Sequence, residues 1–169
     1  MILQLREFWV KPLDLNHTCF RIIDMKLHIG GEEKKEGWKI LNIQKKSYVD
    51  FVGDITDLGK FEDNSIDACY SHMLYCMALT TDDLLKLNNE IKRILKPGGI
   101  NIYTVRHTND GDFQNGNHIG EDLYENDGFI VHYFSEEKVN SLLNGFKNIA
   151  LEKFEEGTFP RKLFSETEN

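Results

Sequence analysis

Short apolar runs alternate with polar segments along most of the chain, which predicts strands separated by turns and helices. Several runs are rich in β-branched and aromatic residues, and most end at glycine or at a polar residue. The predicted strands are 25–31, 37–43, 48–54, 65–71, 99–107, 148–154 and, as a possible partner of the last, 159–164. The KPGG sequence at 96–99 and the acidic pair Glu155 and Glu156 are expected in turns.

Two helices are predicted between these strands. In 81–95, apolar residues recur at three- and four-residue spacing, with acidic residues in the first turn and basic residues in the last. The second predicted helix, 136–144, follows Ser135 as N-cap and stops before Gly145. Strands that alternate with helices indicate an α/β fold. We expect a three-layer, Rossmann-like sandwich with a mainly parallel sheet and a C-terminal antiparallel hairpin.

Two segments do not follow this alternation. Residues 107–128 are rich in Asn, Asp and Gly and have no period, so they are expected to form a lid or binding loop. Residues 1–24 also lack a sustained period. They are either an extension of a domain that spans 25–169 or an N-terminal strand or helix packed on that domain.

Composition narrows the class of protein. The chain has 169 residues, enough for a single domain with a core of its own. Its formal charge of −8 argues against nucleic acid or an anionic membrane as partner. The three cysteines form no C-x-x-C pair, and the first 25 residues lack the apolar core of a secretory signal. We therefore expect reduced thiols and a cytoplasmic location; oligomeric state is not determined by these features.

Three predicted strands end in residues suited to binding a ligand. Gly30 and Gly31 follow the first strand, where glycine lets a ligand approach the main chain. Asn42 ends the second strand, where a polar residue can bind ribose, and Asp54 ends the third. Each also has a purely structural interpretation, as a turn glycine, a turn amide or a helix N-cap.

Two stretches of the sequence resemble a known family. The residues 49–77, VDFVGDITDLGKFEDNSIDACYSHMLYCM, are followed at 90–105 by EIKRILKPGGINIYTV. This order is similar to that of class I S-adenosylmethionine-dependent methyltransferases of the type 11 group. The shared motifs are Asp54 after the third strand, Phe61 to Asp67 before the fourth, and Arg93 to Gly99 before the fifth. The likeness extends over about 25–164, with the first helix shortened to a loop.

The resemblance implies S-adenosylmethionine as cofactor and a small molecule as methyl acceptor. It implies that Gly30 and Gly31 face the methionine part of the cofactor and that Asn42 faces the ribose. Asp54, followed by Ile55, would lie at the adenine. Ser71 and His72, at the end of the fourth strand, would lie beside the methionine and the acceptor.

The sequence also departs from the family pattern. The first motif lacks the usual G-x-G-x-G, Asn42 replaces the usual acidic residue, and Tyr75 and Cys76 replace a glutamate and a histidine. A degenerate methyltransferase fold that binds without turnover is therefore the alternative function. A nicotinamide enzyme would need G-x-G-x-x-G and an acidic residue about twenty positions on, and the chain has neither.

Histidines are the remaining candidates for acid–base chemistry. The candidate catalytic residues are His72 at the end of the fourth strand, His107 after the fifth and His132 just before the second helix, where a loop folded over the cleft could bring His107 and His132 to a substrate. His107, His118 and the aspartates between them match no known ligand spacing, so no metal is expected.

Overall fold

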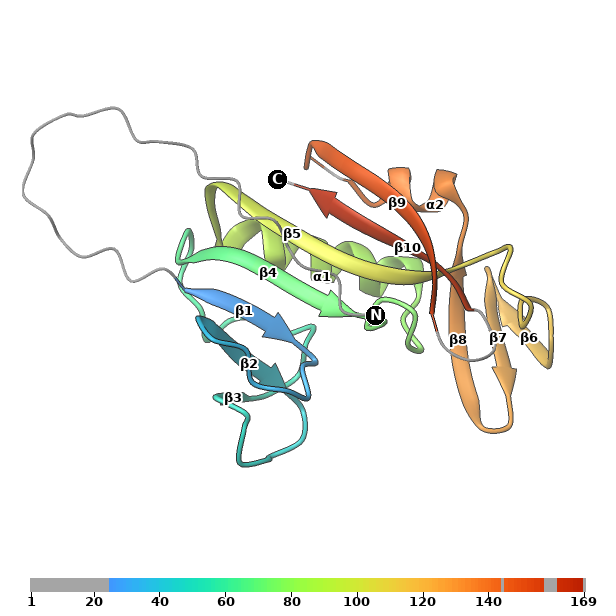
Figure 1. Ribbon diagram of the computed structural model, residues 1–169, viewed down its shortest axis with the longest axis horizontal. Coiled ribbons are helices and arrows are strands. Elements are labelled where there is room, and N and C mark those ends of the chain that lie inside the picture. Colours follow the sequence, from blue (N-terminus) through green and yellow to red (C-terminus); the bar gives the residue numbers. More distant parts are fainter. Residues whose placement is uncertain (1–24, 144, 157–160, 169) are drawn as a thin grey trace, which may run out of the picture.

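The computed structural model describes residues 25–143, 145–156 and 161–168. Five parallel strands form one side of its sheet, from the edge strand β3 inward, in the order β3-β2-β1-β4-β5 (Figure 1). They are β1 Lys26–Ile29, β2 Trp38–Asn42, β3 Phe51–Val52, β4 Ile66–His72 and β5 Leu95–His107. The strand order reverses between β1 and β4. In parallel sheets, ligands bind outside the carboxyl ends of the strands at such a reversal.

A hairpin at the C-terminal end extends this sheet. β10 (Arg161–Glu168) lies antiparallel to β5 and to β9 (Asn148–Glu156), so it sits between them. The expected mainly parallel sheet with a C-terminal antiparallel hairpin is confirmed. The turn predicted at Glu155 and Glu156 is wrong, because these residues pair with Lys162 and Arg161 and complete β9.

The segment after β5 is not the single loop predicted for 107–128. It contains β6 (Asn117–Gly120) and β7 (Leu123–Asn126), which form an antiparallel meander with β8 (Phe129–Phe134). Asp127 and Gly128 connect β7 to β8 with φ angles of 50° and 84°. Asp-Gly is the preferred sequence for a two-residue hairpin turn with positive φ at both positions. This dipeptide was the signal for the hairpin in the sequence.

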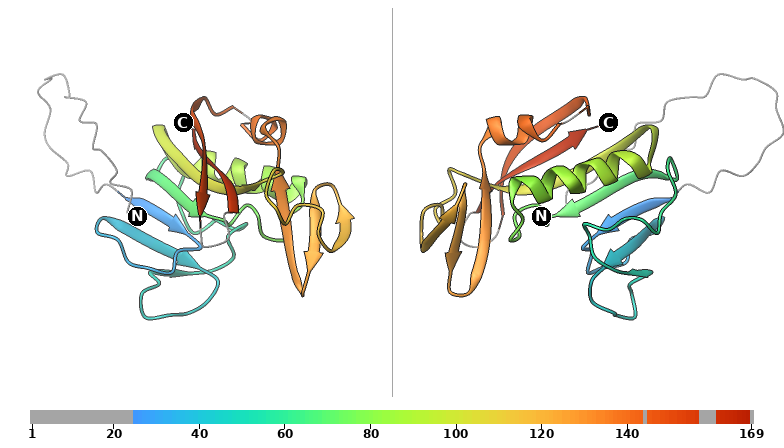
Figure 2. Two further views of the ribbon diagram at one scale, coloured as in Figure 1. Left: turned by 45° about the vertical axis from the view of Figure 1, so that its right-hand side comes forward. Right: turned by 180° about the vertical axis from the view of Figure 1, so that it is seen from behind.

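Helix α1 (Thr81–Ile94) covers one face of the sheet (Figure 2). Thr80 and Asp83 form a capping box at its N-terminus, and its buried stripe includes Leu84, Leu87 and Ile91. The prediction of helix 81–95 is therefore confirmed to within one residue.

Helix α2 (Glu136–Ser141) begins after Ser135 as predicted but is shorter than 136–144. Leu142 caps it, and the Leu142 carbonyl accepts a hydrogen bond of 2.7 Å from Asn88 of α1. A tertiary contact thus satisfies a carbonyl at the end of the helix, which local sequence does not reveal.

Two further predicted boundaries are wrong. Residues 96–99 lie inside β5 as an irregular bulge, because Leu95 and Ile100 pair with Ile66 and Ala68 of β4. The strand predicted at 48–54 is reduced to β3, since the Asp50 carboxylate, rather than a backbone carbonyl, accepts the Ile40 N–H at 3.0 Å.

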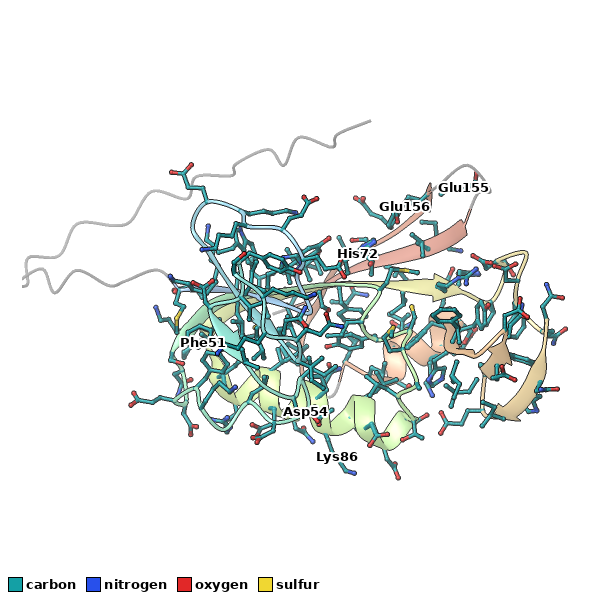
Figure 3. All side chains as sticks on the ribbon, turned by 90° about the horizontal axis from the view of Figure 1, so that it is seen from below. Phe51, Asp54, His72, Lys86, Glu155 and Glu156 are labelled. Atoms are coloured by element: carbon teal, nitrogen blue, oxygen red, sulfur yellow. The ribbon has the colours of Figure 1, made fainter. Side chains whose placement is uncertain are left out.

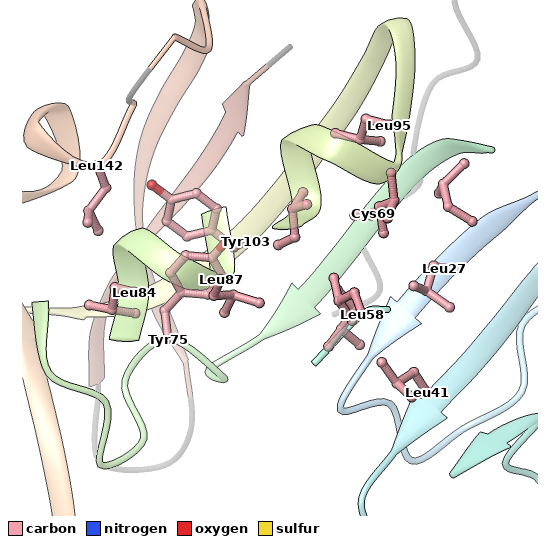
Figure 4. Close-up of a cluster of buried hydrophobic side chains, with 14 of the residues drawn as sticks. Leu27, Leu41, Leu58, Cys69, Tyr75, Leu84, Leu87, Leu95, Tyr103 and Leu142 are labelled. Carbon is pink, nitrogen blue, oxygen red and sulfur yellow. The ribbon is translucent and has the colours of Figure 1, made fainter. Parts of the chain in front are cut away.

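The core lies between α1 and the sheet (Figure 4). Tyr75 and Tyr103 stack there with ring centroids 4.2 Å apart. The Tyr75 hydroxyl donates to Asn88 Oδ1 at 2.5 Å and accepts from Asn101 Nδ2 at 3.2 Å. Cys76 is also buried, and its sulfur accepts the Arg106 N–H. Tyr75 and Cys76, which depart from the family pattern, therefore belong to the core.

Two cysteines of the described residues, Cys69 and Cys76, are free and buried. Burial raises the pKa of both thiols, that of Cys76 to about 12. Cys19 and the predicted extension 1–24 lie outside the described residues. Within the described ranges, neither helix is long and apolar enough to cross a membrane.

Candidate cofactor groove

A groove of about 880 Å³ lies at the carboxyl ends of β1, β2 and β4. Its volume falls within the range of about 300–1,000 Å³ typical of small-molecule sites. Six of the seven residues that the sequence suggested for the cofactor line it: Gly30, Gly31, Asn42, Asp54, Ile55 and His72. The seventh, Ser71, is buried at the end of β4, and its Oγ has no hydrogen-bond partner among the described residues.

Gly30 and Gly31 form the turn that leaves β1. Gly30 has φ +75°, a conformation that favours glycine, and its N–H donates to the Leu41 carbonyl at 2.8 Å. Gly31 packs on the ring of His28, so that a Cβ at Gly31 would lie 2.5 Å from His28 Nδ1. Glycine is therefore favoured at position 30 by the backbone conformation and at position 31 by the lack of space for a side chain.

Asn42 ties this turn to the end of β2. Its Nδ2 donates to the Gly31 carbonyl at 3.1 Å, and its Oδ1 accepts the Gln44 N–H at 2.9 Å. Both polar atoms of the amide are thus engaged with the main chain. Asn42 lines the groove, but it also holds the groove wall together.

Asp54 begins the loop after β3. Its Oδ1 accepts both the N–H and the hydroxyl of Thr56 at 2.8 Å, and these hydrogen bonds hold the pKa of the carboxyl below its usual value. Because both bonds use Oδ1, the second oxygen is available to a ligand donor. Asp54 is therefore an ionised acceptor in the groove lining.

His72 and Glu156, both in the groove lining, lie next to each other (Figure 3). His72 Nε2 lies 3.4 Å from Glu156 Oε2, and His72 Nδ1 lies 2.9 Å from Thr104 Oγ1. The same Thr104 oxygen accepts the Met73 N–H, so its own proton can be donated to Nδ1. When the hydroxyl donates to Nδ1, the proton of the neutral imidazole is on Nε2, toward Glu156. Sequence reasoning missed Glu156, because only the register of β9 brings it here.

His28 lies beneath the same groove. Burial, followed by the charges of Lys35 and His72, lowers its pKa to about 4. Its ring lies 4.8 Å from that of Tyr70, over which Lys35 Nζ sits at 5.2 Å. Because His28 is neutral at pH 7, it adds no positive charge to the groove.

The other two candidate histidines lie away from the groove lining. His107 lines a separate cavity of about 260 Å³ together with Lys153 and Glu155, and its Nδ1 accepts the Asn109 N–H at 2.7 Å. His132 is fully buried in β8, where its Nδ1 lies 2.7 Å from the Leu79 carbonyl. Burial lowers the pKa of His132, which suits a neutral ring that donates to that carbonyl.

The groove is acidic. Its described lining carries four carboxylates and a single lysine: Glu32, Glu33, Asp54, Glu156 and Lys35. Such a lining favours a cationic ligand and repels a phosphate or pyrophosphate group.

The fold and the groove define a Rossmann-like domain with an open groove at the switch point of its sheet. Residues 31–103 match the family model described as methyltransferase domain, type 11. The chain is therefore similar to type 11 methyltransferase domains from the turn after β1 to β5.

Solved structures of methyltransferases share the fold. An S-adenosylmethionine-dependent methyltransferase of Methanosarcina mazei matches with a TM-score of 0.68 and 18% identity, over 86% of this chain and 91% of that one. The 1,6-didemethyltoxoflavin N1-methyltransferase of Burkholderia thailandensis, solved with its substrate and S-adenosylhomocysteine, has a TM-score of 0.68 and 15% identity. It is matched over 85% of this chain and 69% of its own. Among curated proteins, no sequence match was found.

Proposed function

We propose that this protein binds S-adenosylmethionine in the groove and transfers its methyl group to a small-molecule acceptor. The net negative lining is the observation that carries the proposal. The amino and carboxyl groups of the cofactor offset each other, which leaves the charge of the sulfonium. A dinucleotide would bring a pyrophosphate into the same acidic groove at an electrostatic cost.

The residues present suit this cofactor. Asp54 is an ionised acceptor for an adenine amino group, and the turn at Gly30 and Gly31 brings the main chain to the groove. When bound, the cofactor supplies an electrophilic methyl group on sulfur. The protein mainly has to hold donor and acceptor in line and exclude water.

A small-molecule acceptor is supported by a second cavity of about 440 Å³, which shares Met73 and Met77 with the groove. The neighbour from Burkholderia thailandensis acts on a small heterocycle, which is consistent with a compact acceptor. We place the acceptor on this side of the groove.

Thermal unfolding with S-adenosylhomocysteine tests cofactor binding. At 100 times its dissociation constant, the ligand stabilises the folded state by about 2.7 kcal/mol. For a chain of this length, that raises the midpoint by about 5–10 °C. NAD at the same concentration is expected to leave the midpoint unchanged.

Asp54→Asn keeps the acceptor for Thr56 but removes the charge, so it should weaken S-adenosylhomocysteine binding by about fivefold. Asp57→Asn, in the same loop but outside the groove lining, is the matched control. Equal affinities of the two variants would contradict the role proposed for Asp54.

The second candidate is a domain that binds the cofactor without turnover. Its support is Asn42, whose amide is already occupied by Gly31 and Gln44 and replaces the carboxylate usual in the family. Cofactor binding with no formation of S-adenosylhomocysteine across a broad acceptor panel would favour it over the enzyme.

A further inference from the structure

The second cavity adjoins the groove on the side of the β7–β8 hairpin. Its walls come from the loop after β4, from β5 and from the hairpin. Because Met73 and Met77 line both spaces, a molecule in this cavity would lie next to one in the groove. This inference rests on the function proposed above, because the cavity acts as the acceptor site only if the groove holds the methyl donor.

Aromatic rings form much of the cavity wall. Tyr124, Phe129 and Tyr133 line it, and Phe129 is 74% exposed. Phe113 braces Tyr124 and Tyr133 from behind, with ring centroids 5.4 and 5.3 Å away. Such walls suit a flat, apolar body, and their ring faces attract a cation.

The charges of the cavity are also one-sided. Arg106 is buried, with its Nη2 2.6 Å from Asp110 and 2.7 Å from Asp112, and its guanidinium lies 5.1 Å from the centre of the Tyr133 ring. Its positive charge is therefore already matched, and an anionic acceptor would find no unpaired cation there. Asp110 and Asp112 share this one cation, so their cluster keeps a net negative charge, and Asp127 adds a further carboxylate to the lining.

We propose that the acceptor is a flat aromatic molecule that carries a basic nitrogen, and that the protein methylates this nitrogen. The acceptor binds as an ammonium and releases its proton to water; the nitrogen lone pair then forms the new N–C bond while the C–S bond breaks, and the electron pair of that bond stays on sulfur. The positive charge passes from sulfur to nitrogen, where the carboxylates and ring faces stabilise it. The methylated product leaves as an ammonium.

The acidic lining supports nitrogen over oxygen as the nucleophile. An amine binds as a cation, whereas a hydroxyl brings no charge to the carboxylates of Asp112 and Asp127. Once the ammonium proton has left, the free amine needs only to be held in line with the methyl group.

A matched pair of probes tests the charge preference. Calorimetric titration with 2-naphthylmethylamine and with 2-naphthylacetate, in the presence and absence of S-adenosylhomocysteine, compares opposite charges on the same ring. We expect the amine to bind at least about fivefold more tightly. Equal affinities, tighter binding of the acetate, or no binding of either probe would overturn the proposal.

Variants that remove a carboxylate from the cavity lining test whether the preference for the amine arises in the cavity. Asp112→Asn and Asp127→Asn should each weaken binding of the amine by about two- to fivefold and leave the affinity for S-adenosylhomocysteine unchanged. Asp127→Asn protects the test against misfolding, since Asn tolerates the positive φ of that turn. Asp82→Asn, on α1 outside the cavity, is the control and should change neither affinity. Amine binding that is unaltered in both cavity variants would refute the assignment.

The two proposals fail separately. If the unmodified protein does not bind S-adenosylhomocysteine, the proposed methyltransferase function is refuted, whichever probe binds. Normal binding of that ligand, together with a preference for the acetate, would retain the methyltransferase and exclude an amine acceptor.

Discussion

Asn42→Asp gives opposite expectations from sequence and from structure. The sequence suggests that a carboxylate would bind the ribose more tightly than the amide. In the structure, however, Asn42 Nδ2 donates to the Gly31 carbonyl at 3.1 Å, and a carboxylate cannot donate. The variant would place an anionic oxygen against a carbonyl oxygen, and we expect it to loosen the turn after β1.

The expected loss of stability follows from the two hydrogen bonds of the Asn42 side chain, to the Gly31 carbonyl and from the Gln44 N–H. Loss of the bond to Gly31 costs about 1 kcal/mol, and repulsion between the two oxygens adds to this cost. The bond from the Gln44 N–H remains and becomes charge-assisted, which offsets part of the loss. We expect a net destabilisation of about 1–2 kcal/mol, which lowers the midpoint of thermal unfolding by roughly 2–8 °C.

The assay is thermal unfolding at pH 7.5 and again in mild acid. Repulsion by the Gly31 carbonyl raises the pKa of the introduced carboxyl in the folded state. The protonated form can donate to that carbonyl, so the deficit should shrink as the pH falls through this raised pKa. Asn109→Asp, an exposed change of the same charge, is the control and should have little effect on the midpoint.

A variant as stable as the parent at pH 7.5 would refute this reasoning. So would tighter binding of S-adenosylhomocysteine, because it would show that Asn42 serves the ribose rather than the groove wall. We expect the affinity of Asn42→Asp to be equal to that of the parent or weaker.

Three further predictions concern packing and pH. Gly31→Ala should destabilise the fold by about 1–3 kcal/mol in urea unfolding because its Cβ would meet the ring of His28, whereas Gly111→Ala, with open space around it, should be neutral. Tyr75→Phe should cost about 1–3 kcal/mol in the same assay, since Asn88 loses a buried donor; an unchanged midpoint would show that this bond contributes nothing. The imidazole of His28 takes up a proton near pH 6.5 in the unfolded state but only near pH 4 in the folded state. The free energy of unfolding should therefore decrease as the pH falls from 6.5 to 4. His28→Asn should flatten this slope, and an unchanged slope would assign it to other groups.

Local patterns in the sequence were sufficient for the main elements. The stripe of Leu84, Leu87 and Ile91 with its capping residues predicted α1, because helix period and caps are encoded within a few residues. The strand ends at Gly30, Asn42 and Asp54 predicted the groove, because parallel strands bring their carboxyl ends to one edge. The same logic would have found the β7–β8 hairpin from its Asp-Gly turn.

Tertiary structure decided the features that depend on distant partners. Helix α2 ends where Asn88 of another helix meets the Leu142 carbonyl. Glu156 reaches His72 only because the register of β9 and β10 carries it to the groove, and Asn42 binds Gly31 because β1 and β2 are neighbours. The partners in these contacts lie between 11 and 84 positions apart in the chain. Local propensity reports on only a few neighbouring residues, so contacts of this kind are fixed by strand order and register once the sheet has formed.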